Sequence, residues 1–207
     1  GFELSQYEQL FEEKLDLFAA LLKNEPVNWE GSIRPPLRNQ KVFPTIESDR
    51  LKTWIGVGGS PESVVRAAHY DLPLMLAIIG GSPYRFQPYV DLYHRAFEQM
   101  GKPVKPIGIH SPGYIAETDE QAREELWPCF KAMRDRIGRE RGWPPMTRAE
   151  FDNEIEKGSL YVGSPETVAA KLAPVVKTLG ISRFQLKYSA GALGHDKMMR
   201  CIELYGQ

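Results

Sequence analysis

From Thr53 onward, short apolar runs alternate with amphipathic helical patterns, and this alternation limits the possible folds more than any other feature of the chain. Such alternation is typical of parallel βαβ units. The run Leu74 to Ile79 is apolar throughout, as expected of a strand covered on both faces. The pattern predicts strands over residues 53–57, 74–79, 107–109 and 183–188, and helices over 61–70, 84–100, 120–137, 165–179 and 195–205.

The remaining segments fit less regularly around these units. Residues 5–23 have helical apolar spacing, residues 27–33 predict a short hairpin with Gly31 at its turn, and the proline-rich stretch from Pro35 to Pro44 predicts a surface connection. Residues 138–158 predict an insertion loop with a small helix near 148–155, either a lid or a surface segment. We expect one domain over residues 1–207, with about four strand–helix units. Four strands are too few for a free-standing eight-stranded barrel.

Composition excludes several classes of function. The chain has 26 Lys and Arg against 27 Asp and Glu, a net charge of −1, so no overall field attracts nucleic acid or an anionic membrane. No apolar run approaches the roughly 20 residues of a membrane-spanning helix. Cys129 and Cys201 lie in no Cys-x-x-Cys or His-rich cluster, which predicts no metal site and a cytoplasmic protein. The opening residue Gly1 suggests a chain that begins within a longer protein.

The segment Gly58-Gly59-Ser60-Pro61 follows the first predicted strand directly and carries the main candidate site. Glycines let backbone N–H groups approach an anion, Ser60 is a strong N-cap residue, and Pro61 suits the first helical position. The open amides and the helix dipole then favour a phosphate at this helix start.

An ordinary strand-to-helix loop explains the same residues equally directly. In that interpretation Ser60 only caps the helix and Glu62 only complements its dipole. The same tetrapeptide recurs at residues 163–166, where the cap is expected to be self-sufficient. Neither copy is a Walker loop or a dinucleotide-binding fingerprint.

The order of several motifs resembles that of the luciferase-like flavin-dependent oxidoreductases across nearly the whole chain. The motifs are the opening helix from Phe2 to Leu15, Pro26-Val27-x-Trp29 with Gly31, residues 54–63, Leu72-Pro73-Leu74 leading to Ile79-Gly80-Gly81, residues 116–122, and residues 162–169.

This resemblance implies the C-terminal half of a (βα)8 TIM barrel that binds FMN. It implies cofactor-binding roles for Gly58, Gly59 and Ser60, with Ser63 behind them. The implied activity is that of a flavin-dependent monooxygenase or oxidoreductase, using reduced FMN and dioxygen on a small organic substrate. The alternatives are a deazaflavin-dependent reductase of the same superfamily, a non-catalytic flavin-binding protein and an inactive fragment.

The resemblance also implies what lies outside this chain. The first four strands of a whole family member have no counterpart here, and they supply much of the contact to the flavin ring and several catalytic side chains. We therefore expect a homodimer or pairing with the missing half-barrel, and a separate flavin reductase as a further partner.

A few other polar residues follow predicted strands. His110 and Tyr114 are candidates for lining the substrate side of the flavin; the alternative is a hydrogen-bonded core histidine and an interfacial tyrosine. Lys187, Tyr188 and Ser189 end the last strand, where one side chain can approach the flavin or fill the barrel interior. The basic stretch Arg134, Arg136, Arg139 and Arg141 is interpreted as a solvated helix face.

Overall fold

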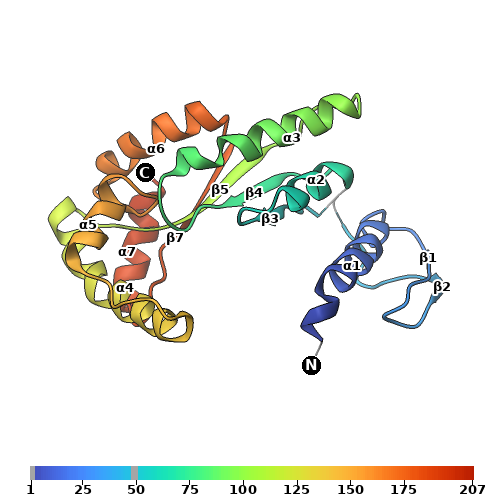
Figure 1. The fold of residues 1–207 in the computed structure, drawn as a ribbon, viewed down its shortest axis with the longest axis horizontal. Helices are drawn as coiled ribbons and strands as arrows, with labels where there is room; N and C mark the ends of the chain where they lie inside the picture. The colour runs from blue at the N-terminus through green and yellow to red at the C-terminus, as the bar shows by residue number, and fades with distance from the viewer. Residues whose placement is uncertain (1–2, 48–50) are drawn as a thin grey trace. The chain divides into compact units, whose positions relative to one another are not determined.

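The structure, a computed structural model, describes residues 3–47 and 51–207 (Figure 1). The chain separates into two compact units, Gly1–Thr53 and Trp54–Gln207. The sequence-based expectation of one domain over 1–207 therefore stays a prediction. Among the described residues, no helix is both long and apolar enough to cross a membrane.

The first unit combines a helix with a small hairpin. A 3-10 turn, η1 (Leu4–Gln6), leads into α1 (Tyr7–Leu21), and β1 (Val27–Trp29) pairs antiparallel with β2 (Leu37–Gln40). The Glu13 carboxylate on α1 accepts the N–H groups of Ser32 and Ile33, at 2.9 and 3.1 Å. The predicted hairpin over 27–33 is thus wrong in its second strand, which lies within the segment predicted as a surface connection.

The second unit is a parallel sheet with helices between its strands (Figure 1). The chain order confirms the predicted strand–helix alternation, and α6 and α7 have the predicted bounds. Its elements are β3 (Ile55–Val57), α2 (Pro61–His69), β4 (Leu74–Ala77), η2 (Pro83–Phe86), α3 (Gln87–Gln99), β5 (Ile107–Ile115), α4 (Asp119–Arg141), α5 (Arg148–Glu156), β6 (Tyr161–Gly163), α6 (Pro165–Leu179), β7 (Arg183–Lys187) and α7 (His195–Tyr205).

Strand β5 is the centre of this sheet. It pairs with β4 over Ile107–His110, with β7 over Gly108–Pro112 and with β6 over Gly113–Ile115, always in parallel. It is six residues longer than the predicted strand 107–109, because the sequence from His110 to Ile115 continues the ladder instead of ending it. Five strands result rather than four, since β6 was not predicted as a separate strand.

The predicted long loop over 138–158 is mostly helical. Helix α4 continues to Arg141, and α5 begins at Arg148 behind a capping box in which Thr147 and Glu150 exchange hydrogen bonds. Only residues 142–147 connect the two helices. Phe151 and Ile155 of α5 are buried in a core cluster with residues of β5, α4, β6, α6 and α7. The segment is therefore part of the packed unit, and its being an insertion stays a prediction.

Candidate functional site

The predicted phosphate loop connects β3 to α2. Gly59 has a φ of +133°, a conformation that L side chains rarely adopt. Ser60 is extended and caps α2, with Pro61 at the start of the helix. Among residues 3–47 and 51–207, no atom outside the adjacent residues lies within 4 Å of a Cβ placed on Gly58, and a Cβ on Gly59 would meet only the Tyr89 hydroxyl, at 3.6 Å. The glycine backbone is thus open to a ligand.

The Ser60 side chain organises the first turn of α2. Its Oγ accepts the Ser63 N–H at 3.2 Å and donates to the Glu62 carboxylate at 2.7 Å. The Ser63 hydroxyl lies 3.3 Å from the same oxygen. The hydrogen bond from Ser60 is the main reason that the pKa of Glu62 lies below its usual value. These contacts confirm the N-cap that the sequence predicts for Ser60.

The amides of this loop differ from those of two similar loops in the same unit. After β4, the Gly81 N–H donates to both carboxylate oxygens of Glu154, at 3.0 and 3.2 Å. Before α6, the Ser164 N–H donates to Asp119 at 2.7 Å. Across residues 3–47 and 51–207, the N–H groups of Gly59 and Ser60 meet no such acceptor.

In the repeated tetrapeptide at residues 163–166, the protein itself therefore supplies the acceptor for the Ser164 N–H. The Asp119 carboxylate also accepts the Thr167 hydroxyl at 2.9 Å. These bonds, chiefly that from the Ser164 amide, lower the pKa of Asp119. A Cβ on Gly163 would lie 2.7 Å from the same carboxylate, so this glycine gives Asp119 its place. The start of α6 thus has the local cap that the sequence predicted, in which Ser164 accepts the Thr167 N–H. It also has an acceptor on a neighbouring helix, Asp119 of α4.

Of the two predicted pocket residues on β5, Tyr114 lies next to the C-terminal end of the strand and His110 does not. His110 pairs with Ala77 of β4 and with Gln185 of β7, in the middle of the strand. Tyr114 is buried, and its hydroxyl donates to Glu125 at 2.6 Å. Burial and then this hydrogen bond raise the pKa of Tyr114. Their roles beside a flavin remain predictions.

A cavity of about 570 Å³ lies at the C-terminal ends of β4 and β7 and beside α4 and α5. Its size is that of a small-molecule site, and barrel enzymes place their chemistry at this end of the strands. Lys187 and Gly80 line it, whereas His110 and Tyr114 do not. Arg134 and Arg141 line it as well. Arg134 is half-buried, so the prediction of a solvated helix face is wrong for this residue, whereas Arg141 is exposed as predicted.

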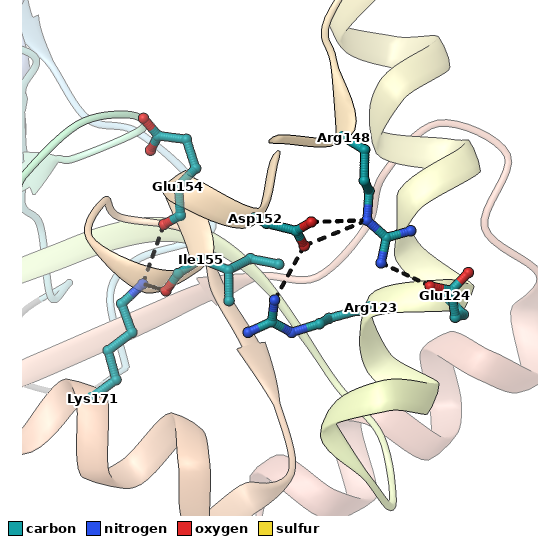
Figure 2. Close-up of polar contacts among 7 residues, drawn as sticks. All are labelled: Arg123, Glu124, Arg148, Asp152, Glu154, Ile155 and Lys171. Atoms are coloured by element: carbon teal, nitrogen blue, oxygen red, sulfur yellow. Dashed lines mark hydrogen bonds and ion pairs between the residues drawn. The ribbon is translucent and has the colours of Figure 1, made fainter. Parts of the chain in front are cut away.

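Half-buried and exposed ionic contacts join α5, which forms one wall of this cavity, to its neighbours (Figure 2). Arg123 of α4 pairs with Asp152 of α5 at 3.1 Å, and Arg148 pairs with Glu124 at 2.7 Å. Lys171 of α6 contacts the C-terminal end of α5. Helix α5 is thereby joined to two neighbouring helices.

Lys171 caps the C-terminus of α5. Its ammonium donates to the carbonyls of Glu154, Ile155 and Leu160, the last at 2.8 Å, and lies 4.8 Å from the centre of the Tyr161 ring. Burial lowers the pKa of Lys171 to about 8. Cations are favoured at a helix C-terminus, where carbonyl groups lack partners. No local sequence pattern predicts this contact, because Lys171 belongs to α6 and the carbonyl groups lie at and after the end of α5.

Potential metal ligands do not gather in the described parts of the chain. Among residues 3–47 and 51–207, no group of three or more His, Cys, Asp or Glu side chains is arranged to hold a metal ion.

Both a family model and solved structures match this chain. Residues 1–183 match the family model described as luciferase-like monooxygenase. No curated protein matches the chain significantly. Among solved structures, monooxygenase RslO1 from Streptomyces bottropensis superposes with a TM-score of 0.78 at 21% identity, covering 99% of this chain and 61% of that one.

Two further solved structures share the fold at lower identity. The oxygenating constituent of 3,6-diketocamphane monooxygenase from Pseudomonas putida, solved with FMN, has a TM-score of 0.67 and 16% identity over 95% of this chain and 61% of its own. An F420-dependent secondary alcohol dehydrogenase, solved with an F420-acetone adduct, has a TM-score of 0.66 and 12% identity over 100% of this chain and 63% of its own. The chain thus spans about three fifths of these structures.

Proposed function

The chain belongs to the luciferase-like monooxygenase family, and we propose that its β3–α2 loop binds the phosphate of a flavin in an oxidoreductase that acts on a small organic substrate. We propose reduced FMN and dioxygen as the cosubstrates. Because the chain spans about three fifths of the structures it resembles, the proposed activity belongs to the complete protein. A homodimer or a pairing with further barrel strands, and a separate flavin reductase, belong to the same proposal.

One observation supports this proposal most strongly: within the described residues, the N–H groups of Gly59 and Ser60 have no hydrogen-bond acceptor. The two similar loops each direct an N–H group at a carboxylate of the protein. An anion in the β3–α2 loop would complete the same pattern with an external acceptor, at the positive end of the α2 dipole. The open space at Gly58 leaves room for the phosphate.

Each residue of the loop has a distinct task in this proposal. The N–H groups of Gly59 and Ser60 donate to phosphate oxygens, and Ser63 supports the Ser60 hydroxyl from behind. Tyr89 donates to the Gly59 carbonyl at 2.9 Å and so holds the glycine in its left-handed conformation. When bound, the flavin supplies the redox chemistry, while the protein orients the substrate and keeps water away.

Deazaflavin is the second candidate cofactor. Among the structures of similar fold, one was solved with FMN and another with an F420-acetone adduct. Both cofactors carry a phosphate, so the β3–α2 loop suits either. Titration of the full chain with each, together with oxygen consumption during turnover, separates a monooxygenase from a hydride-transferring reductase. Retention of flavin without turnover would instead favour a flavin-binding module.

A charge placed at the cap tests the site directly. Ser60→Asp keeps a good N-cap residue, so α2 remains folded, but adds a negative charge against the phosphate. We expect FMN affinity to fall at least about tenfold, since two such charges repel by more than 1 kcal/mol at contact distance. Fluorescence titration of FMN measures the affinity, and circular dichroism confirms the fold.

Ser60→Thr is the matched control. It keeps a neutral hydroxyl at the cap and should bind FMN nearly as the original chain does. Equal FMN affinity for Ser60→Asp and Ser60→Thr would contradict the proposed phosphate site.

A further inference from the structure

The cavity beside α4 and α5 has apolar walls and an excess of unpaired positive charge. Phe130, Met133, Ile137 and Met146 supply much of the apolar lining. Four cations and two carboxylates also line it: Arg85, Arg134, Arg141, Lys187, Glu150 and Glu154. The distribution of partners among these six charges indicates which of them can bind a ligand.

The carboxylates are already occupied by protein donors. Glu154 accepts the Gly81 N–H, and Glu150 accepts the Thr147 N–H and hydroxyl at 2.7 and 2.9 Å. Arg85 donates to the Gly80 carbonyl at 2.7 Å. In the part of the chain that the structure describes, Arg134, Arg141 and Lys187 have no hydrogen-bond acceptor and no ion-pair partner within 4 Å. Of these three, Arg134 is the one with a buried nitrogen.

Arg134 is held in place although it has no acceptor. Its guanidinium lies 4.2 Å from the centre of the Trp143 ring. Nη1 is buried without a hydrogen-bond partner and lies 3.0 Å from the position that a Cβ on Gly138 would take. Stacking on an aromatic ring leaves the in-plane N–H groups of an arginine available to an anion.

The end of α4 explains why Trp143 lies there. Gly142 is left-handed, with a φ of +69°, and the Trp143 N–H donates back to the Gly138 carbonyl at 2.9 Å. This glycine-terminated helix end turns the chain so that Trp143 faces the preceding turns of α4. Gly138, without a side chain, leaves room for the Arg134 guanidinium above it. A ring and a missing side chain thus fix the orientation of the cation.

We propose that this cavity is the substrate pocket and that it takes an apolar molecule bearing one carboxylate, which Arg134 binds. The inference rests on the proposed function, since it names the substrate class of the same enzyme. The apolar lining receives the hydrocarbon part, and the Arg134 guanidinium pairs with the carboxylate through charge-assisted hydrogen bonds. Lys187, at the end of β7, and Arg141 add further positive charge to the wall.

A pair of matched probes tests the proposal on the full chain without flavin. Octanoate and octan-1-ol share the same hydrocarbon chain, but only octanoate carries a negative charge. Calorimetric titration should show that octanoate binds more tightly. In Arg134→Gln its affinity should fall about ten- to hundredfold, while that of octan-1-ol stays unchanged, as expected for loss of a hydrogen bond to a charged group.

Arg136→Gln is the control, because Arg136 is an exposed residue of the same helix outside the cavity lining. It should leave both affinities unchanged. The proposal is overturned if the original chain does not prefer octanoate, or if Arg134→Gln and Arg136→Gln prefer it equally. FMN titration of Arg134→Gln separates the two proposals: unchanged FMN affinity leaves the phosphate site standing whichever result octanoate gives.

Discussion

The roles that we infer for single residues depend on whether their N–H groups have hydrogen-bond acceptors. The Gly59 and Ser60 amides lack acceptors within the described residues, whereas the Lys171 ammonium has three carbonyl acceptors. The first arrangement leaves a place for a ligand anion. The second uses a buried cation to complete a helix end. A charge added at the first place should change ligand affinity, whereas a change of pH at the second should change the stability of the fold.

Lys171 should make the stability of the protein depend on pH. Burial lowers its pKa to about 8 from 10.5, so between these values the unfolded chain binds more protons than the folded one. Folding therefore becomes more favourable as pH rises through this window, and the full cost of the buried charge is present below pH 8. We expect the unfolding free energy, relative to Lys171→Met, to rise by about 1 kcal/mol between pH 8 and 10.

Urea unfolding of both proteins at several pH values measures this difference. Lys177→Met, which removes an exposed lysine of the same helix, is the control and should show no comparable rise. A difference for Lys171→Met that stays flat from pH 8 to 10 would contradict the assigned burial of its charge.

At this scale the sequence predicts local chemistry well and distant contacts poorly. The N-cap at Ser60 and the proline at the first helical position were predictable, because both depend on adjacent residues. The stacking of Arg134 on Trp143 was not predicted, although Gly138 and Gly142 in the same stretch are a signal for it. The contact of Lys171 with α5 depends on how separate helices pack, which no local pattern contains.

Among the elements, strand β5 differs most from its predicted form. The predicted strand ended at residue 109, whereas β5 continues through Pro112 and Gly113, residues that usually interrupt a central strand. In the structure, pairing with β4 ends at His110 and pairing with β6 begins at Gly113. Pro112 therefore lies where the ladder changes partner on passing from β4 to β6, a place where a missing N–H is tolerated.

Gly113 should be essential for the pairing of β5 with β6. A Cβ at this position would lie 2.1 Å from the Tyr161 carbonyl oxygen and 2.5 Å from Leu186. Because the first of these atoms belongs to a backbone, it cannot move aside cheaply. We expect Gly113→Ala to lower the unfolding free energy by about 3 kcal/mol, the upper range for overpacking. Chemical denaturation measures the loss.

Gly56→Ala provides the comparison within the same sheet. Gly56 also lies in a strand, but a Cβ there would meet no atom within 4 Å. This variant should keep the stability of the original chain to within about 0.5 kcal/mol. Equal losses for the two alanine variants would show that Gly113 matters for reasons other than the approach of β6.

At the scale of the whole molecule, the family and the fold class were predictable from the order of motifs. The matching family model over residues 1–183 and the similar solved structures confirm both. Parallel strands joined by helices follow from the alternation of apolar and amphipathic segments. The division into two units at residue 53 was not predicted. The proline-rich segment was interpreted only as a surface connection, whereas it contains β2, which pairs with β1 within the first unit.

The cavity also belongs to the whole molecule, because the loop after β4 and the elements β5, β7, α4 and α5 all contribute residues to its lining. Its residues are spread from Ile79 to Lys187 in the sequence. Only the folded sheet brings them together, which explains why the sequence suggested the phosphate loop but not the substrate pocket. The proposed phosphate site and the proposed substrate pocket thus lie in separate parts of the second unit.

The most direct test of the central claim compares FMN with riboflavin, which lacks the phosphate, by following the backbone amide chemical shifts of the labelled full chain. FMN should shift the Gly59 and Ser60 amides strongly, and riboflavin should leave both nearly unchanged, because only the phosphate meets their N–H groups. If FMN leaves these two amides unchanged, or shifts those of Gly81 and Ser164 most, the phosphate does not bind at the β3–α2 loop and the account is wrong.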